Sequence, residues 1–245
     1  MDNYILNLGY VYPEILSSEV SSLDVFKYRL EKRGIELKIN KINLGNEFFE
    51  NDIYFFTGGP DKSLDSACEE LVKYKDFLQN EVSNGKVVYA VESGFTLISD
   101  YREYKGGKKV DGLGLIDAYS KQEDKRFTGN VIAKFNIAEQ YGFMQDKLLG
   151  FENHNWSMYL GKDVKPLAKI LQGVGNNSKD KTEGAIYKNV IGTWLRGPVV
   201  ANNPSFADFI LKLALQKKYG NEVVLNGLND AEEENIYQEL LAKKY

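Results

Sequence analysis

Val87-Val88-Tyr89-Ala90-Val91-Glu92-Ser93-Gly94-Phe95-Thr96-Leu97-Ile98 is the stretch that decides the fold class of this 245-residue chain. Its first five residues are uncharged and mostly β-branched or aromatic, which is typical of a strand covered on both faces. Small residues follow at once, and the apolar run from Phe95 predicts a helix that continues to about Asp100. A strand, an abrupt turn and a helix form a nucleophile elbow, which presents one side chain to a cleft. The residue at its tip is Glu92.

Before this elbow, hydrophobic periodicity predicts alternating strands and helices. Residues 4–8, 35–39 and 51–56 read as strands, and residues 23–32 and 64–80 as helices, the first with Ser21 or Ser22 as its cap. Cys68 falls inside the second helix, where core packing explains it. Alternation of this kind favours an α/β fold with a mostly parallel sheet flanked by helices.

The second half of the chain predicts some antiparallel strands after the parallel core. Extended segments are expected at 113–117, 127–135, 148–153, 156–160, 185–187 and 190–195, and a helix at 206–218. Residues 1–220 are expected to form one domain, and residues 221–245 a helical tail with a short helix around Ile236 to Leu241.

Composition excludes several classes of function. The net charge of -4 gives no basic footprint for nucleic acid, and no apolar run approaches the roughly 20 residues that span a membrane. One cysteine and one histidine make a zinc site implausible, so no metal and no cofactor are expected. The amino terminus lacks a basic region followed by an apolar core, which predicts a cytoplasmic protein.

Three groups of residues directly follow predicted strands. They are Gly58-Gly59, Glu92 and Arg196. The carboxyl ends of parallel strands meet at one edge of a sheet, where ligands bind in such folds. We therefore expect these residues to converge on one cleft, although they lie far apart in the sequence.

Six stretches, in order, resemble the class I glutamine amidotransferase domains of the cobyric acid synthase type, which have a flavodoxin-like fold. Within that family the match is best to the glutaminase subunit of lipid II isoglutaminyl synthase. The stretches are Asp52 to Asp61, Gly112 to Asp117, Arg126 to Gly129, Gly150 to His154, Gly173 to Asn177, and Gly192 to Pro198. None is specific alone, but six in the same order indicate common ancestry.

The resemblance implies a catalytic cysteine at the elbow, followed by two glycines, and a histidine base at the end of a late strand. This chain has Glu92-Ser93-Gly94 and Arg196 there. Arginine cannot act as the base, because its pKa is above about 12. A carboxylate attacking an amide would have to form an anhydride from a poor leaving group. Glutaminase activity is therefore not expected.

The two substitutions look coupled, because a cysteine–histidine pair has become a glutamate–arginine pair. If the family geometry holds, Glu92 and Arg196 face each other and form an ion pair that fills the former catalytic cleft. The replacement of small family residues by Asn155 and Trp156 suggests a narrower cleft.

Other positions of the family pattern survive. The resemblance places Arg126 near the glutamine site, where a guanidinium could capture a ligand carboxylate. It makes Gly58 and Gly59 the loop whose N–H groups form the oxyanion hole. It also puts His154, the only histidine, close to the cleft, although a lone histidine is more often a hydrogen-bonded structural residue than an acid or base. Ser17-Ser18-Glu19 aligns loosely with a segment that carries a catalytic aspartate in the isoglutaminyl synthase subunit.

Three functions remain open from the sequence. The first is an inactive glutamine amidotransferase-like protein that binds a Mur-ligase-like partner or a small amino-acid-like ligand, or acts in regulation. The second is a divergent hydrolase or amidotransferase that uses Ser93 as nucleophile or Glu92 as general base. The third is a glutaminase subunit that supplies ammonia for amidation of peptidoglycan precursors.

Overall fold

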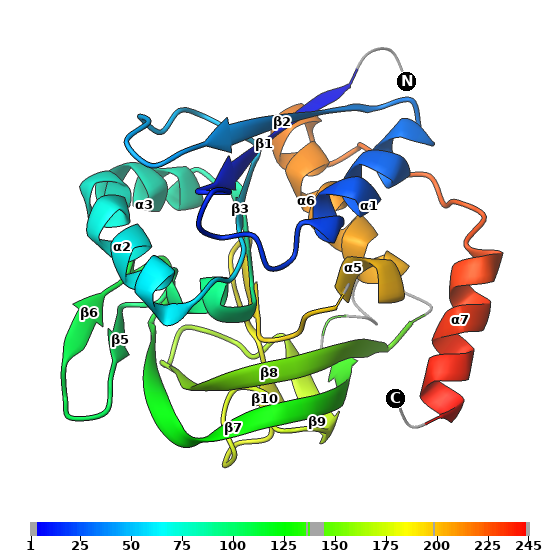
Figure 1. Ribbon diagram of the computed structural model, residues 1–245. Helices are drawn as coiled ribbons and strands as arrows, with labels where there is room; N and C mark the ends of the chain where they lie inside the picture. The colour runs from blue at the N-terminus through cyan, green and yellow to red at the C-terminus, as the bar shows by residue number, and fades with distance from the viewer. Residues whose placement is uncertain (1–3, 136, 138–144, 198, 244–245) are drawn as a thin grey trace.

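A computed structural model describes residues 4–135, 137, 145–197 and 199–243, and within them the chain folds into two sheets with flanking helices (Figure 1). The first sheet has the strand order β11-β12-β4-β3-β1-β2. All of its neighbouring pairs are parallel except β11 with β12. Its strands are β1 (Ile5–Val11), β2 (Glu36–Ile42), β3 (Ile53–Phe56), β4 (Val87–Val91), β11 (Ala185–Tyr187) and β12 (Val190–Thr193).

The second sheet is mostly antiparallel and has the order β10-β9-β7-β5-β6, with β8 paired to β7. Only β5 and β7 pair in parallel. Its strands are β5 (Tyr101–Glu103), β6 (Lys109–Asp111), β7 (Ala118–Phe135), β8 (Lys147–Leu160), β9 (Ala168–Gln172) and β10 (Thr182–Glu183). The predicted α/β architecture, with antiparallel strands in the second half, is confirmed.

Helices cover both faces of the first sheet (Figure 1). The α-helices are α1 (Ser21–Glu31), α2 (Asp61–Leu71), α3 (Lys75–Ser83), α5 (Val199–Asn202), α6 (Pro204–Tyr219) and α7 (Ala231–Ala242). Strand β4 explains this layering, because its side chains alternate between two apolar cores. Val87, Tyr89 and Val91 pack with residues of α1 and α6, while Val88 and Ala90 pack with residues of α2 and α3. None of the helices in the described residues is long and apolar enough to cross a bilayer.

The helix predicted at 64–80 is in fact two helices. A 3-10 turn, Val72–Tyr74, separates α2 from α3. Tyr74 leaves the helical conformation (φ -110°, ψ 11°), and its ring lies 4.7 Å from the ring of Phe48. Packing against the loop that carries Phe48 therefore overrides the continuous helical pattern. Cys68 is buried in the core of α2, as expected.

The helix predicted after the elbow and the strand predicted at 113–117 are both wrong. Only a 3-10 turn, Glu92–Thr96, follows β4. Beyond it the carbonyls of Leu97, Ile98 and Ser99 accept hydrogen bonds from the amides of Leu113, Leu115 and Gly114. Each segment thus satisfies the backbone of the other, so neither forms its own helix or strand.

Three smaller corrections concern element ends. Neither Ser21 nor Ser22 caps α1: its N-cap is Val20, without a side-chain hydrogen bond, and the Ser21 hydroxyl donates to Glu19 instead. The segment 156–160 is not a separate strand but the end of β8. The predicted terminal helix is present as α7.

The elbow depends on a close approach between two chain segments. Glu92 has φ +56°, a left-handed conformation that only a constrained non-glycine residue adopts. Two residues later, a Cβ on Gly94 would lie 2.5 Å from the Thr57 carbonyl oxygen and 2.8 Å from that of Phe56. Gly94 therefore lets the turn pass directly over the end of β3.

Gly94→Ala should destabilise the protein by about 1–3 kcal/mol, because the atoms that the new methyl group meets are backbone atoms that cannot rotate away. The measurement is the free energy of unfolding in urea. Gly227→Ala is the matched control, since a Cβ there would have no atom within 4 Å. Equal stability of the two variants would show that the turn is looser than the structure indicates.

Candidate functional site

Glu92 and Arg196 form the expected ion pair at the carboxyl edge of the first sheet. The Arg196 Nη1 atom lies 2.7 Å from Glu92 Oε1. Glu92 is only 8% exposed, whereas the Arg196 side chain is 33% exposed at the mouth of the cleft. The Arg196 backbone is fixed by two hydrogen bonds, its N–H to the Phe151 carbonyl and its carbonyl to the Phe151 N–H. Strand β8 of the second sheet thus holds the arginine in place.

Both glycine N–H groups at the end of β3 already have partners. The Gly58 N–H donates to Ser18 Oγ at 2.8 Å, and the Gly59 N–H donates to Ser93 Oγ at 3.0 Å. Ser93 in turn donates its hydroxyl proton to the Gly59 carbonyl at 3.1 Å. The resemblance assigned these N–H groups to an oxyanion hole, but here two serine hydroxyls occupy them.

The segment before α1 closes the other side of the cleft. Glu19 is almost fully buried, and its Oε2 atom accepts a hydrogen bond of 2.9 Å from the Gly197 N–H, next to Arg196. The segment Ser17-Ser18-Glu19, which the resemblance aligned only loosely, therefore lies beside the cleft. The sequence alone did not predict that Ser18 and Glu19 bind the two backbone segments that frame the cleft.

A polar cavity of about 140 Å³ remains in front of the ion pair. Arg126 lies at its rim but is partly engaged, because its Nε and Nη2 atoms donate to the side chain and carbonyl of Asn153. Of the site residues chosen from the sequence, Gly59, Glu92, Ser93, Arg126 and His154 line this cavity, whereas Gly58 and Arg196 do not. The cavity is lined by Gly59, Pro60, Asp61, Glu92, Ser93, Arg126, Asn153, His154, Asn155 and Trp156.

Trp156 forms a fixed wall of this cavity. Its indole N–H donates to Asp61 at 3.1 Å, and the Arg102 guanidinium lies 4.5 Å from the ring centre. Arg102 is fully buried and binds Asp61 and Asp65 at 2.9 Å each. The sequence suggested a narrower cleft at Trp156, but nothing in it indicated that a buried arginine would hold the indole.

His154 is buried against the cleft wall, with its ring stacked on Trp194 at 4.2 Å. Its Nδ1 atom lies 2.6 Å from the Trp156 carbonyl, which can only accept, so Nδ1 carries a proton. Its Nε2 atom lies 3.8 Å from Glu152 Oε2. Within the described part of the chain, no hydrogen bond joins His154 to Ser93.

A second buried carboxylate, Glu183, lies behind this wall. It accepts hydrogen bonds from the Thr193 hydroxyl and the Trp194 N–H, while its Oε2 atom has no partner among the described residues. Burial raises the pKa of Glu183 to about 7, and the nearby Glu152 carboxylate adds to the rise. Sequence reasoning missed Glu183, because a lone glutamate at the end of the two-residue strand β10 carries no signal of burial.

The chemistry available to this cleft is limited. The N–H groups of Gly58 and Gly59 face serine hydroxyls, and the Glu92 carboxylate faces a guanidinium. Within residues 4–135, 137, 145–197 and 199–243, no group of three or more His, Cys, Asp or Glu side chains could hold a metal ion.

Comparison with known proteins links this chain to one family. Residues 9–204 match the family model described as a CobB/CobQ-like glutamine amidotransferase domain. The chain is 33% identical over 242 residues to "Lipid II isoglutaminyl synthase (glutamine-hydrolyzing) subunit GatD" of Streptococcus pneumoniae, covering 96% of this chain and 90% of that protein. It is 31% identical to the protein of the same name from Staphylococcus aureus, covering 83% and 81%.

Solved structures support the same fold. The structure of PurLQS from Thermotoga maritima has a TM-score of 0.59 at 17% identity, covering 86% of this chain and 96% of that one. A crystal structure of a glutamine amidotransferase has a TM-score of 0.56 at 15% identity, covering 84% and 98%. At these identities the likeness concerns the fold alone.

Arg196→Met should destabilise the protein by about 1–3 kcal/mol, because it leaves the Glu92 carboxylate buried without a partner. The loss is smaller than for a fully buried pair, since water screens the partly exposed Arg196. The double change Glu92→Gln with Arg196→Met should recover at least half of the loss. Urea unfolding measures both, and a double variant no more stable than the single one would contradict a direct coupling.

Stability should fall between about pH 4.5 and pH 7 through Glu183. Its folded-state pKa, about 7, lies above the ordinary 4.5, so its contribution is fully present below pH 4.5. It is lost as pH rises through 7, and the difference is on the order of 2–3 kcal/mol.

Glu183→Gln should remove this slope, because glutamine does not titrate. Unfolding free energies of the two proteins at several pH values between 4 and 8 provide the comparison. Parallel pH profiles would mean that Glu183 titrates normally.

Proposed function

We propose, from the premise that this chain belongs to the CobB/CobQ-like glutamine amidotransferase domain family, that it is a subunit without glutaminase activity that acts by binding a partner protein. The observation that carries this proposal is the ion pair between Glu92 and Arg196 at 2.7 Å. The pair stands where the resemblance places the catalytic cysteine and histidine.

The chemistry of the family reaction explains why this pair matters. Attack on the amide of glutamine needs a nucleophile that forms a labile acyl intermediate, and a base that protonates the leaving ammonia. A carboxylate held by a guanidinium is a poor nucleophile, since its negative charge is stabilised. Arg196 cannot exchange a proton near neutral pH.

The backbone donors of the cleft support the same proposal. An oxyanion hole must offer free N–H groups to the charge that develops in the transition state. The N–H groups of Gly58 and Gly59 donate to Ser18 and Ser93 instead. Glutamine would have to displace both hydroxyls before its carbonyl could be polarised there.

The names of the relatives support a partner-binding role. Two relatives, which this chain covers over 90% and 81% of their length, carry names that describe a subunit of lipid II isoglutaminyl synthase. We propose a Mur-ligase-like protein as the partner of this chain, with the fold kept for assembly or regulation and not for ammonia production. The remaining cavity, with Arg126 at its rim, suits a small amino-acid-like ligand.

Two active alternatives have different support. Glutamine hydrolysis is favoured by the names of the relatives, which specify it for those proteins. A hydrolase that uses Ser93 has less support, because the Ser93 hydroxyl donates to a backbone carbonyl and not to a base. Glu92 as a general base would first have to leave Arg196.

The natural protein should release no ammonia from glutamine above the uncatalysed background, measured by coupling ammonia to glutamate dehydrogenase. Glu92→Cys with Arg196→His restores the nucleophile and the base but leaves Ser93 on the Gly59 N–H. Adding Ser93→Gly frees that donor, so the triple variant should exceed the double one by about 10-fold or more.

Circular dichroism and urea unfolding of each variant provide the control for folding. Ammonia release by the natural protein that stops in Glu92→Gln or Ser93→Ala would overturn the proposal and establish one of the active alternatives. Inactivity of a folded triple variant would locate a further block at the Trp156 wall.

A further inference from the structure

A mainly apolar groove of about 260 Å³ lies between α1, α5, the start of α6 and α7 (Figure 1). It shares no lining residue with the cleft around Glu92. Val200 and Pro204 are buried beside it, and the helices α1 and α7 form its walls. Its lining consists of Asp24, Val25, Tyr28, Arg29, Val200, Ala201, Pro204 and Glu233.

Large apolar side chains are exposed around this groove. Tyr28 is 50% exposed on the α1 wall. Ile236 is 56% exposed and lies one turn after Glu233 on α7, on the same side of that helix. Val20, at the start of α1, is 42% exposed. Aromatic residues bordering an apolar groove are typical of surfaces that bind another protein.

The uncompensated charges in the lining of the groove are negative. Arg29 is neutralised, because its guanidinium binds both Asp208 and Asp230 at 2.6–2.9 Å. Asp24 and Glu233 stand on the two walls, and neither forms an ion pair with any of the described residues. Glu232 and Glu234 also belong to the first turn of α7 but do not line the groove.

Two lysines lie near the groove, on α1 and at its C-cap, but neither lines it: Lys27 pairs with Glu31 at 3.8 Å, and Lys32 lies beside Tyr28. Lys32 lies one turn beyond Tyr28, with its ammonium 5.3 Å from the centre of the tyrosine ring. It occupies one face of that ring and is not part of the groove lining. The groove therefore combines an apolar floor, an exposed aromatic ring and two unpaired carboxylates.

We propose that this groove binds a partner protein through a basic amphipathic helix. The helix places a large apolar side chain over Val200 and beside Tyr28, and lysine or arginine residues opposite Asp24 and Glu233. Helices dock in this way when an apolar stripe fits a groove and flanking charges fix the register. The inference rests on the partner-binding role proposed above, but not on the state of the cleft.

Charge also argues against two other occupants. A second copy of this chain would bring the acidic first turn of α7 toward acidic walls. An anionic membrane surface would be repelled by Asp24 and Glu233. Both occupants nevertheless appear as distinct outcomes of the experiment below.

The experiment is photo-crosslinking of the full-length protein in its native cells. Tyr28 is replaced by p-benzoyl-phenylalanine, and the crosslinked peptide is sequenced by mass spectrometry. Phe49 replaced in the same way is the control, since it is an aromatic residue of similar exposure, 47%, in the loop between β2 and β3. Position 28 should yield a protein segment with a large apolar residue and lysine or arginine within one helical turn.

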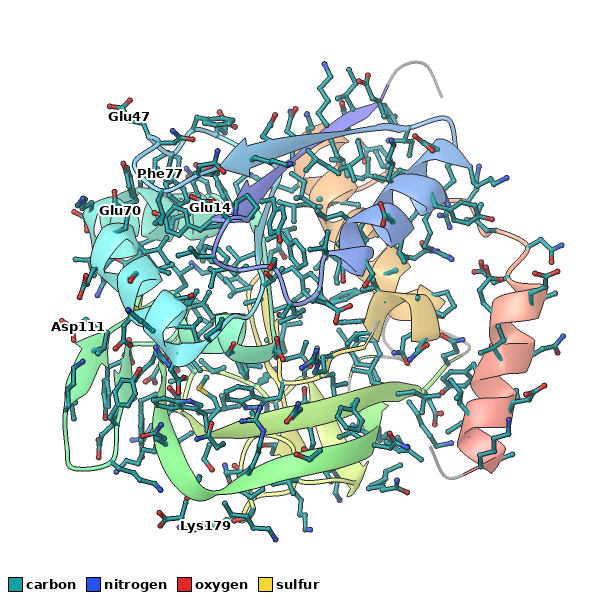
Figure 2. All side chains as sticks on the ribbon, in the orientation of Figure 1. Glu14, Glu47, Glu70, Phe77, Asp111 and Lys179 are labelled. Carbon is teal, nitrogen blue, oxygen red and sulfur yellow. The ribbon has the colours of Figure 1, made fainter. Side chains whose placement is uncertain are left out.

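A synthetic peptide of the crosslinked segment then tests the charges by fluorescence anisotropy. Asp24→Lys with Glu233→Lys should weaken its binding by about tenfold or more. Asp111→Lys with Glu47→Lys makes the same change in net charge elsewhere. Figure 2 shows both control residues on the opposite side of the molecule from α7, and neither forms an ion pair within the described residues. This control should change the affinity by less than about twofold.

Several results would overturn the groove as the docking site. In the crosslinking experiment, these results are a yield at position 28 no higher than at position 49, a crosslink to lipid or to a second copy of this chain, or a crosslinked segment that is acidic. In the binding experiment, the contradicting result is an equal loss of affinity from the two charge reversals. A partner that crosslinks only at position 49 would remove the groove but leave the partner-binding role intact. Ammonia release by the natural protein would remove the proposed function without affecting the crosslinking result.

Discussion

The left-handed conformation of Glu92 is the constraint on which the centre of this molecule depends. A φ of +56° turns the chain sharply at the end of β4, so that the carboxylate enters a cleft and does not continue the strand. The turn is possible because Gly94 passes over the carbonyls at the end of β3. The same crowding prevents a long helix after the elbow, and the carbonyls of residues 97–99 bond instead to the segment that leads into β7. The chain that follows this strained residue therefore passes from the first sheet to the second.

Around this constraint, the polar groups of the cleft satisfy one another. Arg196 follows β12 and is positioned by its backbone bridge to Phe151 of β8, and it neutralises the carboxylate that the elbow presents. Ser18 and Ser93 occupy the N–H groups of the neighbouring glycines. A buried charge or donor is costly only when it lacks a partner, so these contacts make the cleft a stable part of the fold.

Particular elements show why the sequence predicted some features well and others poorly. Strand β4 could be predicted because a run buried on both faces has a local signature. The break between α2 and α3 could not, because Tyr74 leaves the helix to pack against Phe48 from another loop. Ser21 has the right residue type for a cap, yet its hydroxyl donates to Glu19. Arg126 and His154 were placed near the cleft, but the hydrogen bond of Arg126 with Asn153 depends on the register between β7 and β8.

The sequence by itself indicated the α/β class, the buried strand β4 and the sharp turn at Glu92, and it led to the hypothesis that Glu92 and Arg196 replace two catalytic positions. These follow from local patterns and from residue identity, which need no knowledge of distant contacts. Only the tertiary structure decided that the two side chains meet at 2.7 Å, that serines occupy the glycine donors, and that Trp156 is held by Arg102. Burial and hydrogen bonding between distant segments arise when the two sheets pack together, and no local pattern encodes them.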